Sequence, residues 1–216
     1  MEVVESIAKM TAAISSAGTI RVRFFLALFA ALAAHVFVPA ARAQESAVQL
    51  DPAQTKIEFT LGDVFHTVLG TFKLKSGAVQ FDPSTGRTSG TIVVDATSGD
   101  SGNGRRDRKL PRDVLESDKF PEIIFTLSQM KGALAPQRPS RVEVSGHFRL
   151  HGQDHDVTLP IDIQPAGRQL QFATHITIPY VQWGLQNPST LILRVSKVVE
   201  IDIHAVGQLV RSQASR

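Results

Sequence analysis

The stretch FTLGDVFHTVLGTFKLKSGAVQFDPSTG, residues 59–86, alternates apolar and polar side chains between breaks made of Gly, Asp and Pro. In its second segment, Val68, Phe72 and Leu74 fall on one parity. A period of two is the pattern of a strand that places one face on an apolar interior and the other in water. The stretch therefore predicts consecutive strands joined by short turns.

The same alternation continues along the rest of the chain, and loops rich in Pro and Gly, such as residues 135–139 and 165–167, interrupt it. About nine or ten short strands at this spacing are typical of an all-β sandwich or barrel. We therefore expect one all-β domain. The further strand segments are GTIVVDA, EIIFTL, RVEVSGHFRLHG, DVTLPIDIQ, LQFATHITI and TLILRVSKVVEIDIHAVG.

Residues 95–121 break the alternation. Asn103 can cap a helical turn because its side chain accepts backbone hydrogen bonds. Pro111 lacks a backbone donor and is expected to divide the helical segment. We predict two short helices, at about residues 104–110 and 112–117, across one end of the sheet.

Residues 1–43 have the pattern of an export signal. Arg21 and Arg23 precede an apolar run at residues 24–38, and the tripeptide Ala-Arg-Ala at 41–43 matches a cleavage site with small residues. We therefore predict a signal peptide that is cleaved after residue 43.

A membrane anchor is the alternative, because the apolar run can be extended to nearly the length of a membrane span. His35 and Pro39 interrupt this extended run, which favours cleavage. The lead is long for a signal peptide, so translation could begin at Met1 or at Met10. After cleavage, residues 44–216 would form a single domain, either in a periplasm or secreted.

Composition excludes several classes of site. The chain contains no cysteine, which excludes disulfides, thiolate metal sites and a lipid-modified cysteine. Without residues 1–43 the chain carries 19 basic and 18 acidic residues, a net charge of about +1. A nucleic-acid-binding domain would carry a clear basic surplus.

The histidines suggest two alternatives in which the protein has a catalytic or metal site. His66 has Asp63 near it in sequence and could act as a base, but no nucleophile is visible beside it. His151 and His155 could meet across the turn between them and share a metal ion. We favour plainer interpretations, in which His66 is a polar residue between two strands and His147 and His151 lie on a solvent face.

Phenylalanines recur on the apolar parity of the predicted strands. If these strands close into a barrel, the interior either fills with side chains or holds one slender apolar ligand. A filled barrel without a ligand therefore stands beside the hypothesis of an apolar tunnel. The candidate tunnel residues are Phe59, Phe72, Phe125, Phe148 and Phe172, with Tyr180 and Trp183 at one end.

The segment GNGRRDRK, residues 102–109, is the densest positive cluster after the predicted signal peptide. Backbone N–H groups at a helix start, together with arginines, suit a phosphate or pyrophosphate. A solvated helix face is the plainer interpretation. Asn103, Arg105 and Arg106 are the candidate contacts for a ligand head group.

Three segments, in order and with consistent spacing, resemble the YceI-like family, also called the lipid or polyisoprenoid-binding-like domain. SGNGRRDRKL, residues 101–110, resembles the family's T-G-N-x-x-R-D-x-x-L segment. KFPEIIF, residues 119–125, is similar to K-Y-P-x-I-x-F, and GHFRLHGQDHDVTL, residues 146–159, keeps the spacing of the G-x-L-x-I-x-G hairpin. The resemblance runs from about Val48 to Val206.

The resemblance implies an extended antiparallel, lipocalin-like β-barrel with one or two short helices near its mouth. Members bind isoprenoid or other long-chain amphiphiles in an apolar tunnel, and many are exported to the bacterial periplasm. We therefore expect a periplasmic or secreted lipid-binding protein that has no enzymatic activity, cofactor or metal. An open mouth or unpaired edge would permit a homodimer. The alternatives are a periplasmic enzyme that uses the histidines and a stress-response module with a filled barrel.

One segment departs from the family pattern. Where many members have I-D-R-x-D-F-G, this chain has IPYVQWG, residues 178–184. Trp183 and Gly184 keep the aromatic residue and the glycine, while the residues at 179–182 replace the charged positions. The head-group contacts and the identity of the ligand therefore stay open.

Overall fold

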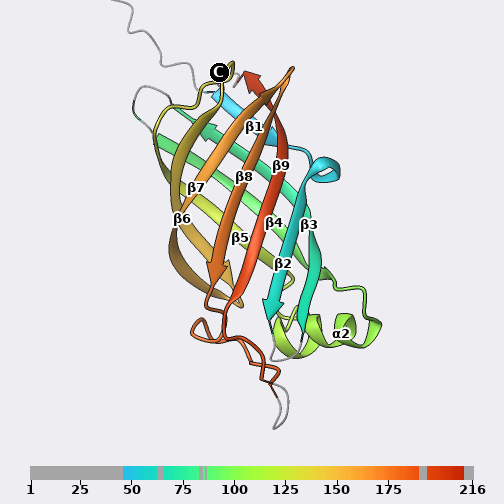
Figure 1. Cartoon of the computed structure of the whole chain (residues 1–216). Helices are drawn as coiled ribbons and strands as arrows, with labels where there is room; N and C mark the ends of the chain where they lie inside the picture. The colour runs from blue at the N-terminus through green and yellow to red at the C-terminus, as the bar shows by residue number, and fades with distance from the viewer. Residues whose placement is uncertain (1–45, 63–65, 83–84, 86, 190–193, 212–216) are drawn as a thin grey trace, which may run out of the picture. The chain divides into compact units, whose positions relative to one another are not determined.

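The structure, a computed structural model, describes residues 46–62, 66–82, 85, 87–189 and 194–211 (Figure 1). The predicted signal peptide, both candidate start residues and Asp63 lie outside the described residues.

Nine antiparallel strands form one sheet that closes on itself. The ring runs β2-β3-β4-β5-β6-β7-β8-β9 and returns to β2. The strands are β1 (Ser46–Leu50), β2 (Lys56–Gly62), β3 (Thr67–Phe81), β4 (Arg87–Asp100), β5 (Glu122–Lys131), β6 (Ser140–Leu150), β7 (Gln153–Ala166), β8 (Gln169–Ile178) and β9 (Val199–Arg211). The predicted antiparallel, lipocalin-like β-barrel is confirmed.

Strands β1 and β2 share one position in this ring. β1 pairs with the last residues of β3 and of β9, whereas β2 pairs with the first residues of both. A 3-10 turn, η1 (Pro52–Gln54), separates β1 from β2, and the Asp51 side chain caps it by accepting a hydrogen bond from the backbone N–H of Ala53. The barrel therefore has eight strand positions around its circumference.

The two ends of the barrel differ. β1 lies at one end, here called the β1 end, and the helix α2 (Gly104–Lys109) lies at the other, here called the helix end (Figure 1). Tightly packed apolar side chains seal the β1 end. Six of them, each no more than 7% exposed, are Val48, Leu50, Phe81, Met130, Ile163 and Leu170.

The helical segment differs from its prediction at Pro111. Asn103 caps α2 as expected, accepting from the backbone N–H groups of Arg105 and Arg106. However, Pro111 does not divide the segment, because α2 continues directly into a π-helical turn, η2 (Leu110–Val114). The wider turn bonds the N–H of Leu115 to the carbonyl of Leu110, so it accommodates a residue that cannot donate.

Two strands differ in detail from the expected pattern. The segments that follow His66 form one strand, β3, in which a register shift at residues 74–76 interrupts the regular alternation. The last strand was expected from residue 190, but β9 begins at Val199, and the described residues 194–198 form no strand.

Candidate functional site

The predicted tunnel phenylalanines lie on the inner face of the barrel. Phe59 lies opposite Ile201 on β9, and Phe125 lies opposite Phe148 on β6. The ring centroids of Phe59 and Phe72 are 5.4 Å apart. Side chains that are partners across antiparallel strands point to the same face, so these residues line one continuous apolar wall. Phe172 joins this wall opposite Ala205.

Several inward side chains keep accessible surface, in contrast to the sealed β1 end. Phe72, Phe148 and Phe172 are half-buried, although they lie on the same face as the fully buried core. Ile201 and Ile203 of β9 are also half-buried. Phe59 and Phe125, in contrast, are buried in the core. The half-buried aromatic and branched side chains are therefore the part of the wall that offers contact area to an apolar chain.

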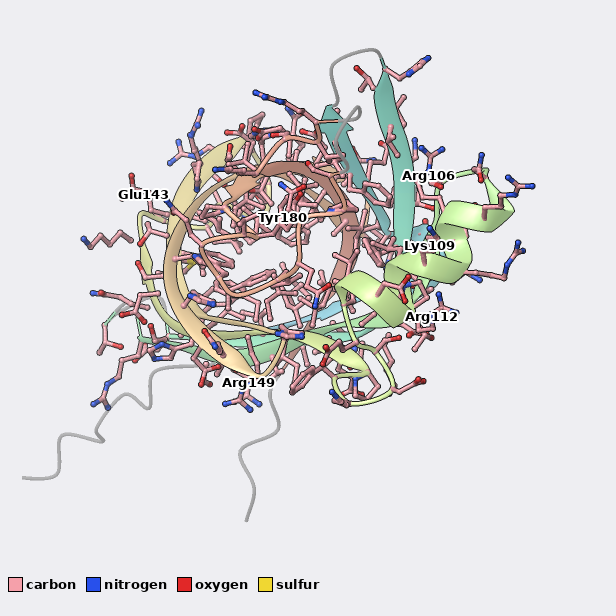
Figure 2. The ribbon with its side chains drawn as sticks, turned by 90° about the horizontal axis from the view of Figure 1, so that it is seen from below. Arg106, Lys109, Arg112, Glu143, Arg149 and Tyr180 are labelled. Carbon is pink, nitrogen blue, oxygen red and sulfur yellow. The ribbon has the colours of Figure 1, made fainter. Side chains whose placement is uncertain are left out.

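The turn after β8 covers the helix end. Tyr180 is buried there and donates a hydrogen bond from its hydroxyl to the backbone carbonyl of Ser196, at 2.6 Å. Burial raises the pKa of Tyr180, so its phenol stays neutral. Viewed from the helix end, Tyr180 lies within the ring of strands (Figure 2). Trp183, in the same turn, lies 5.8 Å from Phe148 between ring centroids.

Two neighbouring strands of the barrel, β7 and β8, are not paired along their whole length. The ladder between β7 and β8 ends at the pair Asp162 and Ala173, although both strands continue toward the helix end. We call the unpaired region between the two strands the fork. At its start, the Thr174 hydroxyl donates to the Pro160 carbonyl at 2.8 Å, so a side-chain hydrogen bond replaces the next backbone hydrogen bond. Pro160 has no N–H to donate to a neighbouring strand.

A pocket of about 300 Å³ fills the fork. Along each strand, neighbouring side chains point to opposite faces of the sheet. The pocket includes Leu159 and Ile176 from the inner face, and Thr158 and His175 from the outer face. It is therefore a lateral slot that connects the outside of the wall with its apolar inner face, and Trp183 also lines it.

A second pocket, of about 410 Å³, lies where β2, β3 and the end of β4 meet. Phe59 and Leu69 contribute apolar surface, but three carboxylates, those of Glu58, Asp100 and Asp202, also line it. This concentration of negative charge disfavours an anionic head group at this position.

The head-group candidates lie on the helix outside the ring. Arg106 donates from Nε to the hydroxyl of Ser101 at 2.8 Å, and Figure 2 shows it beside Lys109, away from the barrel interior. Arg105 is exposed. The Asn103 side chain is engaged in capping the helix. The structure does not bring these three residues to the phenylalanine wall, and their head-group role stays a prediction.

The histidines singled out from the sequence lie in different environments. His66 is exposed directly before β3, which agrees with its interpretation as a polar residue between strands. His151 is half-buried: its Nε2 lies 3.5 Å from the carboxylate of Glu116, and its ring packs on Phe120. His151 therefore does not lie on the solvent face, as the alternation suggested. Within the described residues, no three His, Asp or Glu side chains lie where they could hold one metal ion.

The sequence singled out His155 only as an acid, base or metal ligand, and its surroundings were missed. It lies on the inner face opposite Phe148, and its ring stacks on Trp183 with centroids 4.0 Å apart and planes 5° apart. The two residues are far apart in sequence. The only signal for the contact was the aromatic residue kept at position 183.

A family model for the YceI-like domain matches residues 48–207. The chain belongs to the YceI-like family. A search of curated proteins found no match. No helix in the described part of this YceI-like chain is long and apolar enough to cross a membrane.

Solved structures share the fold of this YceI-like barrel. BcnA from Burkholderia cenocepacia is 21% identical, with a TM-score of 0.60, and the match covers 73% of this chain and 98% of BcnA. A polyisoprenoid-binding domain from Saccharophagus degradans, implicated in plant cell wall breakdown, is 16% identical with a TM-score of 0.56. That match covers 74% of this chain and 97% of the domain. At these identities the likeness shows the fold alone.

Charged side chains of the YceI-like barrel form pairs on its outer face. Arg149 and Asp154 bond through two contacts of 2.8 Å. His175 lies between two carboxylates, with Nδ1 2.8 Å from Asp202 and Nε2 2.9 Å from Glu200. The hydrogen bond to Asp202, together with that to Glu200, raises the pKa of His175 above its ordinary value of 6.5.

His175 should make the stability of the barrel depend on pH. Because its pKa is higher in the folded state, its stabilising effect is complete below the unfolded pKa and is lost as pH rises through the folded pKa. Solvent screens this exposed cluster, so the effect should be about 0.5 kcal/mol. Urea unfolding should show wild type more stable than His175→Gln at about pH 6 and equal to it at about pH 9.

A histidine titration followed by NMR checks the cause directly. The His175 signal should titrate above the ordinary histidine value, and in Asp202→Asn its midpoint should fall. A wild-type midpoint at or below that ordinary value would contradict the assignment.

Proposed function

We propose that this protein binds a long isoprenoid or similar amphiphilic chain against the inner face of its barrel. The observation that supports this most is the continuous apolar wall, in which Phe72, Phe148 and Phe172 stay half-buried while the β1 end is sealed. A closed end and a lined interior suit one slender ligand that enters from the helix end or from the side.

Hydrophobic contact is sufficient to hold such a ligand. Burial of one methylene group contributes about 0.8 kcal/mol, so a chain of about a dozen carbons gains roughly 10 kcal/mol before the cost of immobilisation. A polar anchor is then needed for selectivity more than for affinity. The function would be sequestration and carriage, in which no residue needs to be catalytic.

Two findings support this proposal. The chain belongs to the YceI-like family, and a similar structure is described as a polyisoprenoid-binding domain. In addition, charged pairs on the strands, such as Lys56 with Glu58 and Arg149 with Asp154, lie on the outer face. Charges kept off the inner wall favour an apolar cargo.

We also propose that the chain is exported and works in a periplasm or outside the cell. The pattern of residues 1–43 supports this proposal. When the full chain is expressed in a Gram-negative bacterium, the periplasmic fraction should contain a protein that begins at Gln44. Its intact mass should equal that of residues 44–216. A purified protein that retains residues 1–43 would contradict cleavage.

Extraction tests the binding function. The full chain should be expressed in a bacterial host, purified without detergent and extracted with organic solvent, and the extract examined by mass spectrometry. A polyprenyl, quinone or fatty amphiphile in stoichiometric amount would establish a carrier. A protein that yields no lipid and also fails to bind added farnesol would overturn the proposal and favour a filled barrel.

A further inference from the structure

One polar atom of the inner wall has no hydrogen-bonding partner. The Nε2 atom of His155 is buried, and no group of the described residues bonds to it. A buried polar atom without a partner costs about 1–3 kcal/mol, so structures usually satisfy such atoms. This atom is therefore a candidate for contact with a ligand.

The surroundings of His155 are apolar on the inner side. Trp183 stacks on its ring, and Phe148 is its partner across the hairpin. The neighbouring polar residues are paired on the outer face, where His147 bonds Asp156 at 2.7 Å and Asp154 bonds Arg149. None of these described neighbours supplies a partner for Nε2.

The lateral slot lies next to the stack of His155 and Trp183. Trp183 both lines the slot between β7 and β8 and stacks on His155, so the slot and the imidazole share one side chain. A ligand that entered through the fork would pass Leu159 and Ile176 and reach the aromatic stack. The polar atom, the stack and the slot therefore belong to one site.

We propose that His155 is the polar anchor of this site and hydrogen-bonds a neutral oxygen, a hydroxyl or carbonyl, of the bound isoprenoid-like chain. This inference rests on the proposed lipid-binding function and adds the class of group that the ligand carries. A neutral imidazole can accept from a hydroxyl or donate to a carbonyl, depending on its tautomer. Trp183 stacks on the imidazole and holds the plane of the ring.

The same surroundings disfavour a phosphate at this position. An anion in an apolar wall needs charged partners, because its desolvation is costly. Arg149, the cation nearest in sequence on the neighbouring strand, points outward and is bonded to Asp154. The arginines of α2 lie outside the ring (Figure 2). A neutral oxygen needs only the one partner that His155 offers.

A matched pair of ligands tests the proposal. Farnesol and farnesene have the same number of carbons, but only farnesol carries an oxygen. Both should be titrated into the full chain, with binding followed by the fluorescence of Trp183, the only tryptophan in the sequence. Wild type should bind farnesol about tenfold more tightly than farnesene, which is the effect of one buried hydrogen bond.

Three variants isolate the role of Nε2. His155→Phe should keep the aromatic stack and the affinity for farnesene but lose most of the preference for farnesol. His155→Gln, which keeps a hydrogen-bonding group at a similar reach, should restore part of the preference. His147→Phe is the matched control, because it makes the same change on the outer face of the same hairpin and should leave both affinities unchanged.

The outcomes separate this inference from the proposed function. If wild type binds neither ligand, the proposed function fails. If wild type binds both ligands and His155→Phe keeps the full preference for farnesol, the function stands and the anchor is wrong. Circular dichroism of His155→Phe checks folding, and retention of farnesene binding shows that the wall is intact.

Discussion

Phe72→Arg is expected to lower the affinity for farnesol at least 100-fold, which corresponds to about 2.7 kcal/mol. Phe72 is part of the apolar wall, 5.4 Å from the ring of Phe59 and half-buried. An arginine at this position removes aromatic contact area and places a charge beside the bound chain. Because the position keeps access to water, the guanidinium can reach solvent and the barrel should still fold.

Isothermal titration or Trp183 fluorescence measures this loss, and two variants control for its cause. Thr71→Arg adds the same charge at the neighbouring position, which pairs with Glu58 and points outward, and should leave the affinity unchanged. Phe72→Leu should weaken binding only a few-fold, since it keeps an apolar contact. Wild-type affinity in a folded Phe72→Arg protein would remove Phe72 from the binding wall.

Leu170→Ala should have the largest effect on stability, lowering the free energy of unfolding by about 2–5 kcal/mol. Leu170 is 2% exposed and belongs to the packed β1 end, where its partner across the hairpin is Pro165. The cavity that the substitution leaves cannot collapse easily between paired strands. For a domain of this size, Tm should fall by roughly 5–15 °C.

Leu69→Ala is the matched control, because it makes the same chemical change at a side chain that is 65% exposed. Thermal unfolding of this control should differ little from wild type. Equal losses in both variants would contradict a sealed core at the β1 end. Leu170→Ala should also keep its farnesol affinity at a temperature where it is folded, because Leu170 lies at the end opposite the slot.

The stability of the barrel and its binding of the ligand are expected to depend on different ends of the barrel. The β1 end is closed by β1 and by side chains from facing strands, and this packing supports the ring. Toward the helix end, β7 and β8 are not paired with each other beyond Asp162 and Ala173, although each stays paired with its other neighbour. An unpaired segment gives up backbone hydrogen bonds, a cost that is common at functional positions.

The alternating pattern was enough to predict which phenylalanines share the inner wall. In a strand the period of two assigns each side chain to one face, and paired strands keep that assignment across the sheet. Phe125 and Phe148 are therefore on the same face in the prediction and opposite each other in the structure. The Asn103 cap was predictable for a similar reason, since capping depends on a few neighbouring residues.

Tertiary structure alone decided the fork and the aromatic stack. The sequence placed His155 beside a turn and Trp183 at one end of the tunnel, but their contact requires β7 to meet the turn after β8. The end of the ladder between these strands depends on the curvature of the whole ring and on contacts such as Thr174 with Pro160. Likewise, Pro111 is accommodated by a π turn that local helix rules did not predict.

By itself, the sequence determined the fold class, the inner wall and the helix cap of this protein, because these depend on periodicity and on near neighbours. The lateral slot and the unpartnered Nε2 atom of the His155 imidazole, stacked on Trp183, were decided only by the tertiary structure. They arise where segments distant in sequence meet, and side-chain periodicity carries no information about which strands lose their pairing or which rings come to stack.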